Sequence, residues 1–460
     1  MKKYTQILAD YLADLKYEDI PAEVIERAKM VTLHTVGVAL GAAKAKTVRE
    51  AIEVAKVMGE SERGATIFGD GSKVSVTSAA FANGMMSDFL DWEDCSWTGH
   101  PCSGAVPAGL AVAEAYGKSG KDYLTSFVGG FEVYQRIAMA VQPTPERFDA
   151  GWGLYCWQIF APTAVSGKLL NLSADKLNQL IGTAAGMCPV ATEQINATNT
   201  DFYHYTYGLT AKMGVECSLI VDKGITTLKD ALEEYGGYWF GVSDQCDWDW
   251  FDKELGSHYY LMDMLLKNWP ANMWIQAPLD LLHRMVTANG IKADDIESIE
   301  MSPFIPNRSE NWPEGYPSTV RAQFSIPFCL AMYLRGPQLG WEWAEEKYLK
   351  DPVILEMANR FKGVGRVERV SSQFDRFREG GYPTYEMKIT LKDGTAYEDS
   401  IQFPKGHPQN PYTREECIEN FRVATATIFT AEQCDKLVDL IMNRLEDVED
   451  LSILGEYLKA

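Results

Sequence analysis

Helical segments rich in alanine and glycine dominate the first 240 residues of the chain. Three of them read VTSAAFANGMMSDFL (76–90), GAVPAGLAVAEAYG (104–117) and IGTAAGMCPVA (181–191). Small side chains at helical spacing allow two helix axes to approach closely. The segment 22–42 also places apolar or small residues along one stripe, at Val24, Ala28, Val31, Thr35, Val38 and Ala42. These features predict a compact bundle of buried helices.

The pattern changes near Lys267, where strand-like segments begin. Strand composition is found at 297–305, 367–374, 385–391 and 396–403. The last two segments flank Asp393-Gly394, a dipeptide typical of tight hairpin turns. Helices are predicted between the strands at 277–289 and 319–335, and amphipathic helices return from Thr413 onward.

This order of segments predicts a mainly α protein with an insertion. Residues 1–267 form the first part of a large all-helical domain, and residues 268–403 form an inserted α+β domain. Residues 404–460 form C-terminal helices that rejoin the first domain. The helical domain is therefore expected to be built from both ends of the chain.

Charge and targeting signals exclude several function classes. The chain has 64 acidic and 43 basic residues, a net charge of −21, which argues against nucleic acid and anionic membranes as partners. A small anionic substrate would need a locally basic pocket. The N-terminus reads as an amphipathic helix rather than a signal peptide, and no apolar run approaches the roughly 18 residues of a membrane span. Nine cysteines without a C-x-x-C pair fit free thiols in the cytoplasm.

The common nucleotide and metallohydrolase motifs are missing from the sequence. The segment GKSGK (117–121) lacks the upstream glycine of a P-loop, and neither G-x-S-x-G nor H-E-x-x-H occurs. The remaining alternatives are an enzyme that needs no cofactor and a protein without catalytic activity.

The densest polar cluster is DFLDWEDCSWTGHPCSGAVPA, residues 88–108. A helix continuing through Cys95 would bring Asp91, Asp94 and Cys95 together, with His100 on the loop that follows. A carboxylate and an imidazole in a low-dielectric pocket suit proton transfer. The alternative is a solvated helix end with a hydrogen-bonded turn histidine. A metal held by Asp91, Glu93 and His100 is disfavoured, because their spacing matches no standard site.

Two further clusters are candidates for substrate binding. In NTDFYHYTYGLTAKMGVE (199–216), Tyr203 and Lys212 could donate hydrogen bonds to an oxyanion, although aromatic packing at a domain junction explains the segment equally well. In LKNWPANMWIQAPLD (266–280), Trp269-Pro270 suggests a rigid aromatic wall. Gln276 could orient a substrate or cap the helix.

At these clusters the chain resembles the MmgE/PrpD family, which includes 2-methylcitrate dehydratase, cis-aconitate decarboxylase and iminodisuccinate epimerase. The resemblance rests on the order and spacing of several segments: ANG, DWED, HP and GAVPA within 82–108, GGFEVYQR (129–136), KLLNL (168–172), GVECSLIVDKGIT (214–226), QFSIPFCLAMYL (323–334) and PKGHPQNPYTREE (404–416). It implies that the inserted domain is a lid, that the protein is a homodimer without metal or organic cofactor, and that the active site lies between the helical domain and the lid.

Family positions in the first motif carry over well. The family's acid falls on Asp91 and its His-Pro histidine on His100. Cys95 stands where the decarboxylases have a threonine.

Other family positions are changed. The family's lysine falls on Tyr203, with Lys212 a turn or two further on. Its lid histidine falls on Gln276, with Trp269-Pro270 in place of Tyr-Pro. A further histidine is lost from GWGLYC (151–156), where Tyr155 or Cys156 takes the neighbourhood.

These replacements remove cationic anchors for a tricarboxylate. The resemblance therefore implies a substrate with fewer carboxylates than methylcitrate or aconitate, or with a larger apolar part. Lys267, Arg308 and Arg321 could supply compensating charge.

The sequence hypothesis is a cofactor-independent lyase of the hydratase/dehydratase type that abstracts an α-proton from a small carboxylic acid. His100 and Tyr203 would be the acid/base pair, and Asp91 would orient His100. The substrate-binding candidates are Cys95, Tyr155, Lys212, Gln276, Trp269 and Arg321. An epimerase using the same proton transfer is the first alternative, and a decarboxylase is less favoured. The alternative of another class is a non-catalytic ligand-binding or assembly protein.

Overall fold

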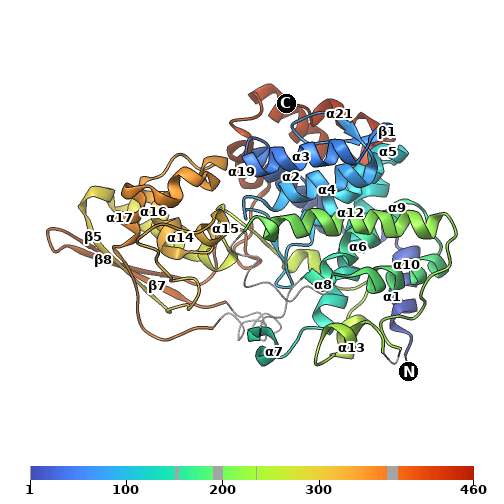
Figure 1. Cartoon of the computed structure of the whole chain (residues 1–460), viewed down its shortest axis with the longest axis horizontal. Helices are drawn as coiled ribbons and strands as arrows, with labels where there is room; N and C mark the ends of the chain where they lie inside the picture. Colours follow the sequence, from blue (N-terminus) through green and yellow to red (C-terminus); the bar gives the residue numbers. More distant parts are fainter. Residues whose placement is uncertain (1, 151–154, 190–199, 235, 370–381) are drawn as a thin grey trace.

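Residues from both ends of the chain share one hydrophobic core. In Figure 1 the N-terminal helices, in blue, lie beside the C-terminal helices, in red. The computed structural model describes residues 2–150, 155–189, 200–234, 236–369 and 382–460. The helices of the larger domain are α1 (Tyr4–Asp14), α2 (Ala22–Ala42), α3 (Lys46–Met58), α4 (Val76–Asp88), α5 (Cys102–Tyr116), α6 (Gly120–Ala140), α7 (Pro145–Asp149), α8 (Tyr155–Gln158), α9 (Phe160–Leu169), α10 (Ala174–Met187), α12 (Phe202–Asp222), α13 (Tyr238–Val242), α19 (Arg414–Thr425), α20 (Ala431–Val438) and α21 (Leu454–Tyr457). The prediction of a mainly α fold is confirmed.

Helix α2 lies at the centre of this domain and is buried along nearly its whole length. Its bounds, Ala22–Ala42, are those predicted from the apolar stripe. The C-terminal helix α19 packs directly on it, because two glycines of α2 leave room. A Cβ added to Gly37 would lie 2.6 Å from the Phe421 ring, and one added to Gly41 would lie 2.6 Å from the Ala424 carbonyl oxygen. Small residues therefore bring the two chain ends together.

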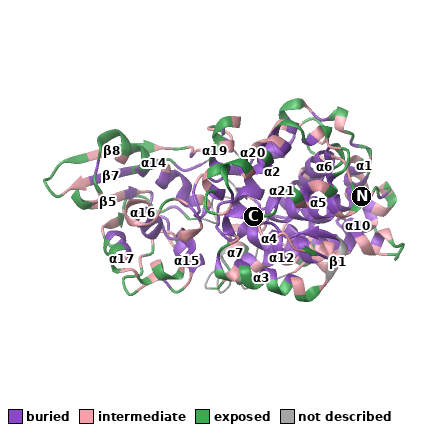
Figure 2. Ribbon diagram, turned by 90° about the horizontal axis from the view of Figure 1, so that it is seen from above, coloured by how far each residue is buried: buried purple, intermediate pink, exposed green. Residues whose placement is uncertain are grey.

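The inserted domain has its own core, from Trp269 to Ile389 (Figure 2). Its helices are α14 (Met273–Asn289), α15 (Thr319–Gln323), α16 (Ile326–Arg335) and α17 (Pro352–Ala358). Its sheet has the order β6-β5-β7-β8, formed by β5 (Ile296–Ser302), β6 (Phe361–Gly363), β7 (Tyr385–Leu391) and β8 (Ala396–Ile401). Strand β5 is parallel to β6 and antiparallel to β7, with Ile299 opposite Ile389.

The local predictions for this domain hold with two differences. The hairpin between β7 and β8 turns at Asp393-Gly394, where Gly394 has φ +88°. The segment 319–335 forms two helices instead of one, because Ser325 caps a new helix by accepting a hydrogen bond from the Phe328 N–H. The predicted strand 367–374 is limited to a bridge between Val367 and Phe304, and its residues from 370 lie outside the described part of the chain.

Two short antiparallel ribbons lie outside this sheet. Strands β1 (Glu60–Thr66) and β2 (Lys73–Val74) pair with each other, as do β3 (Asp94–Cys95) and β4 (Leu265–Leu266). Each of the nine cysteines carries a free thiol. In the described ranges, no helix has the length and apolar character that crossing a membrane requires.

Replacing Gly406 with alanine is expected to destabilise the β3–β4 ribbon. Gly406 has φ +86°, and an added Cβ would lie 1.8 Å from the Leu266 carbonyl oxygen, so β4 would have to move. Gly394 is the matched control: its φ is +88°, but the described chain places no atom within 4 Å of an added Cβ. We expect Gly394→Ala to cost about 1–2 kcal/mol of unfolding free energy from the left-handed backbone alone, and Gly406→Ala to cost about 1–3 kcal/mol more. Denaturant titration of both variants measures the difference, and equal losses would contradict the clash.

Candidate active site

The site begins where α4 ends, at the turn that leads into β3. The helix stops at Asp88, and Asp91 adopts a left-handed conformation with φ +52°. Asp94 and Cys95 then pair with Leu266 and Leu265 of β4. A continuation of the helix through Cys95, which the sequence left open, is therefore not formed in this described segment, because the backbone of Asp94 and Cys95 pairs with a strand about 170 residues further along the chain. The ribbon places the side chains that precede β3 next to those that follow β4.

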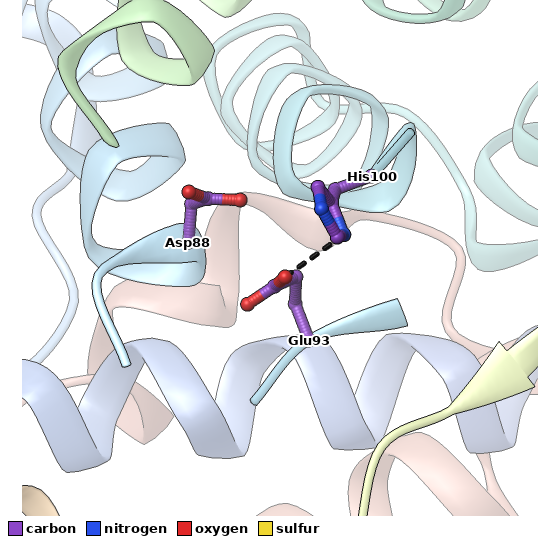
Figure 3. A group of neighbouring side chains, drawn as sticks. All are labelled: Asp88, Glu93 and His100. Atoms are coloured by element: carbon purple, nitrogen blue, oxygen red, sulfur yellow. Dashed lines mark ion pairs between the residues drawn. The ribbon is translucent and has the colours of Figure 1, made fainter. Parts of the chain in front are cut away.

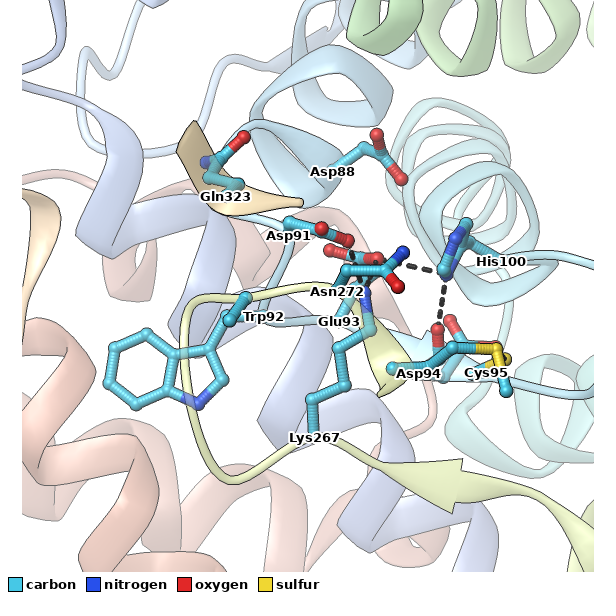
Figure 4. A network of polar contacts seen from close by, with 12 residues as sticks. Asp88, Asp91, Trp92, Glu93, Asp94, Cys95, His100, Lys267, Asn272 and Gln323 are labelled. Atoms are coloured by element: carbon cyan, nitrogen blue, oxygen red, sulfur yellow. Dashed lines mark hydrogen bonds and ion pairs between the residues drawn. The ribbon is translucent and has the colours of Figure 1, made fainter. Parts of the chain in front are cut away.

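Lys267 is the centre of a buried polar cluster (Figure 4). Its ammonium contacts the Asp91 carboxylate and lies 2.6 Å from Glu93 Oε1. His100 Nδ1 lies 2.8 Å from the same Glu93 oxygen and 2.5 Å from the Asp94 carbonyl oxygen. The sequence hypothesis gave Asp91 the role of orienting His100. The structure gives that contact to Glu93, because the left-handed turn directs Asp91 to the ammonium.

The three ionic groups of the cluster shift one another's pKa. Burial acts to raise the pKa of Glu93, but the Lys267 and His100 cations outweigh it and lower this pKa to about 2. Burial and Lys267 act to lower the pKa of His100, but the Glu93 carboxylate and its hydrogen bond raise it to about 9. Burial also opposes the Lys267 cation, whose pKa is nevertheless raised by Asp91 and Glu93. At neutral pH His100 is therefore an imidazolium, which can donate a proton.

Tyr203 faces the other nitrogen of His100. The Tyr203 hydroxyl lies 3.5 Å from His100 Nε2, and both side chains are almost completely buried. Tyr203 packs against Val320 and Phe324 of the inserted domain, with ring centroids 5.4 Å apart in the case of Phe324. The predicted juxtaposition of His100 and Tyr203 is present, at the contact between α12 and the inserted domain.

The backbone that carries His100 is held from behind by α6 and α8. The Thr98 carbonyl oxygen accepts hydrogen bonds from the Tyr134 hydroxyl (3.0 Å), the Trp157 indole (2.6 Å) and the Gln158 amide (3.1 Å). Gly99 follows with φ +127°. The loop is therefore fixed, and His100 has little freedom to leave the cluster.

A second imidazole–carboxyl pair lies next to the first. His204 Nδ1 is 2.7 Å from Asp88 Oδ2, and both side chains are fully buried. Burial raises the pKa of Asp88 well above its ordinary value, with a further contribution from Glu93, and burial lowers the pKa of His204. The pair is therefore held in its uncharged form.

Asp88, Glu93 and His100 each offer one atom to a group that spans no more than 4.8 Å (Figure 3). Such a group resembles a metal site in its composition. The cation position is already taken, however, because Glu93 Oε1 accepts from both Lys267 and His100. The donor set does not fit a metal ion.

Cys95 and Lys212 make contacts that do not involve the imidazole. The Cys95 thiol lies 3.3 Å from the Met273 sulfur, and burial raises its pKa to about 12. Lys212 lies nine residues beyond Tyr203 on α12 and forms an ion pair with Glu216 at 3.3 Å. Cys95 adjoins the site as a neutral thiol, and Lys212 is directed to its own helix.

Gln276 and Trp269 are structural residues of the inserted domain. Gln276 accepts from the Asn268 and Trp269 N–H groups and donates to the Trp269 and Ala271 carbonyl oxygens, at 2.7–3.0 Å. These four bonds use the hydrogen-bonding capacity of the amide, so Gln276 holds the turn after Lys267 and is not available to orient a substrate. Trp269 donates to Asp280 (2.7 Å) and packs in the core of the inserted domain.

Three candidate residues remain, Arg321, Arg308 and Tyr155. Arg321 is on α15, where its N–H is capped by Ser318, and its side chain is partly exposed. Arg308 is half-buried, lies 4.6 Å from the Phe324 ring centroid, and donates to Asn272 Oδ1 at 3.1 Å. The backbone of Tyr155 begins α8, but its side chain, the basis of the prediction, lies outside what the structure describes.

Glu93 and Lys267 are the site residues that the sequence hypothesis missed. Glu93 was considered only as a metal ligand, and Lys267 only as a compensating charge. Their one sequence signal is position, since Glu93 adjoins the motif and Lys267 stands at the boundary where the inserted domain begins.

Comparisons with known proteins cover the whole of this architecture. The model of the MmgE/PrpD N-terminal domain matches residues 6–250, and that of the MmgE/PrpD C-terminal domain matches residues 269–444. Cis-aconitate decarboxylase of Mus musculus is 24% identical over 481 residues, covering 100% of this chain and 94% of that protein. The enzymes of that name from Homo sapiens and Aspergillus terreus are 25% and 23% identical, each with 95% of its length covered and with 100% and 99% of this chain, respectively.

Proposed function

Because this chain belongs to the MmgE/PrpD family, we propose that it is a lyase of the hydratase/dehydratase type that acts on a small carboxylic acid without a cofactor. The observation that carries the proposal is the contact of His100 Nε2 with the Tyr203 hydroxyl at 3.5 Å, beside a buried cluster in which cations and carboxylates alternate. Such a cluster fixes the protonation state of the imidazole that faces the substrate.

In the proposed elimination a single imidazole, that of His100, both donates and accepts a proton. The His100 imidazolium gives its Nε2 proton to the leaving hydroxyl, and the carbon–oxygen bond breaks to release water. The neutral imidazole then takes the proton from the carbon next to the carboxylate, and the electron pair of that bond forms the double bond. His100 ends the cycle protonated, as it began. Tyr203 hydrogen-bonds the reacting group beside it.

Two further features suit a hydroxy acid. An ammonium has three N–H groups; Lys267 uses two for Asp91 and Glu93, and the third can donate a hydrogen bond to the substrate carboxylate. Among the described residues, Asp91 Oδ2 and Glu93 Oε2 are buried and have no hydrogen-bond partner. A substrate hydroxyl supplies the donor that these oxygens lack.

The substrate is expected to carry fewer carboxylates than methylcitrate or cis-aconitate. Lys267 is neutralised by the protein's own carboxylates, and a tyrosine stands at position 203, where the resemblance placed a lysine. We expect purified protein to turn over methylcitrate and cis-aconitate at least about a thousandfold more slowly than a hydroxy monocarboxylic acid that it accepts, because each buried unpaired charge costs several kcal/mol. Steady-state assays of the three acids check this, and ordinary turnover of either tricarboxylate contradicts it.

Hydrogen–deuterium exchange tests the proposed activity directly. Protein is incubated in heavy water with a panel of 2- and 3-hydroxy acids and the corresponding unsaturated acids, and NMR follows α-proton exchange and product. We expect exchange with formation of the unsaturated or hydrated acid. His100→Asn should slow both by about 10²–10⁴-fold, whereas His283→Gln, at an exposed histidine of the inserted domain, should leave both unchanged.

The other outcomes discriminate the alternatives. Inversion of a stereocentre without an unsaturated product identifies an epimerase, and release of carbon dioxide identifies a decarboxylase. Thermal stabilisation by a ligand without exchange identifies a binding protein. Each of these results overturns the proposed hydratase/dehydratase activity.

A further inference from the structure

The strands that carry the polar cluster are too short to hold their own register. Strands β3 and β4 have two residues each, and one further bond joins the Lys267 N–H to the Glu93 carbonyl oxygen at 3.2 Å. A two-stranded ribbon of this length is not stable by itself. The alignment of Glu93 with Lys267 must therefore be imposed by another element.

Helix α2 contacts both strands at the points where they begin. Arg27 Nη2 donates to the Met264 carbonyl oxygen at 2.7 Å, directly before β4. His34 Nε2 lies 2.8 Å from the Trp92 carbonyl oxygen, between Asp91 and Glu93. Arg27 and His34 are seven residues apart, which places them on the same face of the helix two turns from each other. Both side chains are buried.

We propose that Arg27 and His34 are positioning residues that set the register of Glu93 against Lys267 and thereby place the carboxylate that pairs with His100. The proposal deepens the lyase function and rests on it for its catalytic meaning. Neither residue touches the reacting atoms. Each acts through a backbone carbonyl, one ahead of each strand.

The tautomer of His34 follows from its partner. A carbonyl oxygen only accepts, so the proton must be on Nε2 and Nδ1 must be bare. In the part of the chain that the structure describes, Nδ1 is buried without a hydrogen-bond partner. Burial lowers the pKa of His34 to about 4, so the ring stays neutral at working pH. A leucine would pack better in such a core, but it could not hold the Trp92 carbonyl.

The carbonyl that His34 holds lies in a strained turn. Asp91, directly before Trp92, has φ +52°, a conformation that persists only where surrounding contacts enforce it. Without the His34 bond the turn can relax, and Glu93 moves away from His100. The groups that face His100 are Glu93 and Asp88 from the α4–β3 segment, Asp94 from β3, Lys267 beyond β4, and Tyr203 with the Tyr207 ring from α12. Glu93 is the one in direct ionic contact, so its displacement lowers the pKa of His100.

Nitrogen NMR of histidine-labelled protein tests the proposal without an activity assay. The chain has six histidines, and substitution assigns their signals. In the wild type, His34 should show the Nε2–H tautomer and no titration down to pH 5, and His100 should titrate near pH 9. In His34→Leu the His100 titration should fall by at least one pH unit, toward the ordinary value of about 6.5. His34→Gln, whose amide nitrogen replaces Nε2–H, should restore it.

Two further measurements test the proposal: the activity of the His34 variants and the His100 titration in an Arg27 variant. We expect kcat to fall about a hundredfold in His34→Leu, because small displacements of catalytic groups have effects of that size, and to recover in His34→Gln. Arg27→Met should shift the His100 titration in the same direction.

An unchanged His100 titration in folded His34→Leu overturns the proposal, whatever the substrate proves to be. If that variant does not fold, the wild-type spectrum tests the proposal. An Nδ1–H tautomer of His34 would overturn it, because that tautomer cannot donate the bond to the Trp92 carbonyl. Failure of the lyase function alone would leave these NMR results intact.

Discussion

Replacing Lys267 with methionine is expected to lower the free energy of unfolding by about 3–5 kcal/mol, the cost of removing one partner from a buried ionic cluster. Methionine fills a similar volume, so the loss is electrostatic. Asp91 and Glu93 would then face each other in the protein interior without the ammonium that contacts both. Urea unfolding of the two proteins under identical conditions measures the effect.

The pH dependence of this loss has a definite sign. In the wild type, burial already raises the pKa of Asp91 although Lys267 acts to lower it, so removing the ammonium raises this pKa further above its value in the unfolded chain. The folded variant therefore binds more protons than the unfolded chain, and its stability falls as the pH rises. We expect the difference from the wild type to be smallest near pH 5 and to grow toward pH 8.

Two controls separate the buried cluster from a general effect of charge removal. Lys388 forms an exposed ion pair with Glu398 at 2.8 Å, and Lys388→Met should change stability by less than about 1 kcal/mol. The triple variant Asp91→Asn, Glu93→Gln, Lys267→Met removes every charge of the cluster except that of His100 and should recover most of the lost stability. A Lys267→Met protein as stable as the wild type would show that the ammonium does not balance the two carboxylates.

Local sequence patterns were sufficient where a segment's neighbours in the chain determine its structure. The stripe of 22–42 matches α2 to the residue, and Asp393-Gly394 matches the hairpin, because helix periodicity and turn chemistry act over a few residues. Local patterns did not predict the structure of the segment 89–95, because that structure depends on a residue pairing far along the chain. Its strand partner, Leu265–Leu266, lies about 170 residues away, and pairing with it overrides the helical continuation.

The residues of the candidate site also fall into those that the sequence indicates and those that depend on contacts between distant segments. His100 was found because it stands in a motif of the resemblance, and Tyr203 because it stands in a polar aromatic cluster where the family has a lysine; the structure brings the two to 3.5 Å. The contact of Glu93 with Lys267 depends on the ribbon register, which no local pattern encodes. Gln276 was a binding candidate because its amide can orient a substrate. In the structure that amide makes four hydrogen bonds to the nearby backbone, so it stabilises the turn instead.

Replacing His100 with asparagine is expected to lower kcat by about 10²–10⁴-fold, the range for loss of a general acid or base. The asparagine amide can replace the Nδ1–H donor to Glu93 and to the Asp94 carbonyl oxygen. It has no group at the position of Nε2, which faces Tyr203. The variant should therefore fold normally while losing the proton donor, and circular dichroism and unfolding of the variant check the first part.

The pH profile of the wild type tests whether His100 acts as the donor. Its pKa is about 9, so the imidazolium is present at lower pH, and kcat/KM should fall as the pH rises through about 9. Glu93→Gln removes the carboxylate that raises this pKa, so the falling limb should move down toward about 6.5. A limb that rises through pH 9 would mean that the neutral imidazole starts the reaction by taking the α-proton. The order of the two proton transfers would then be reversed, although the same imidazole would carry both.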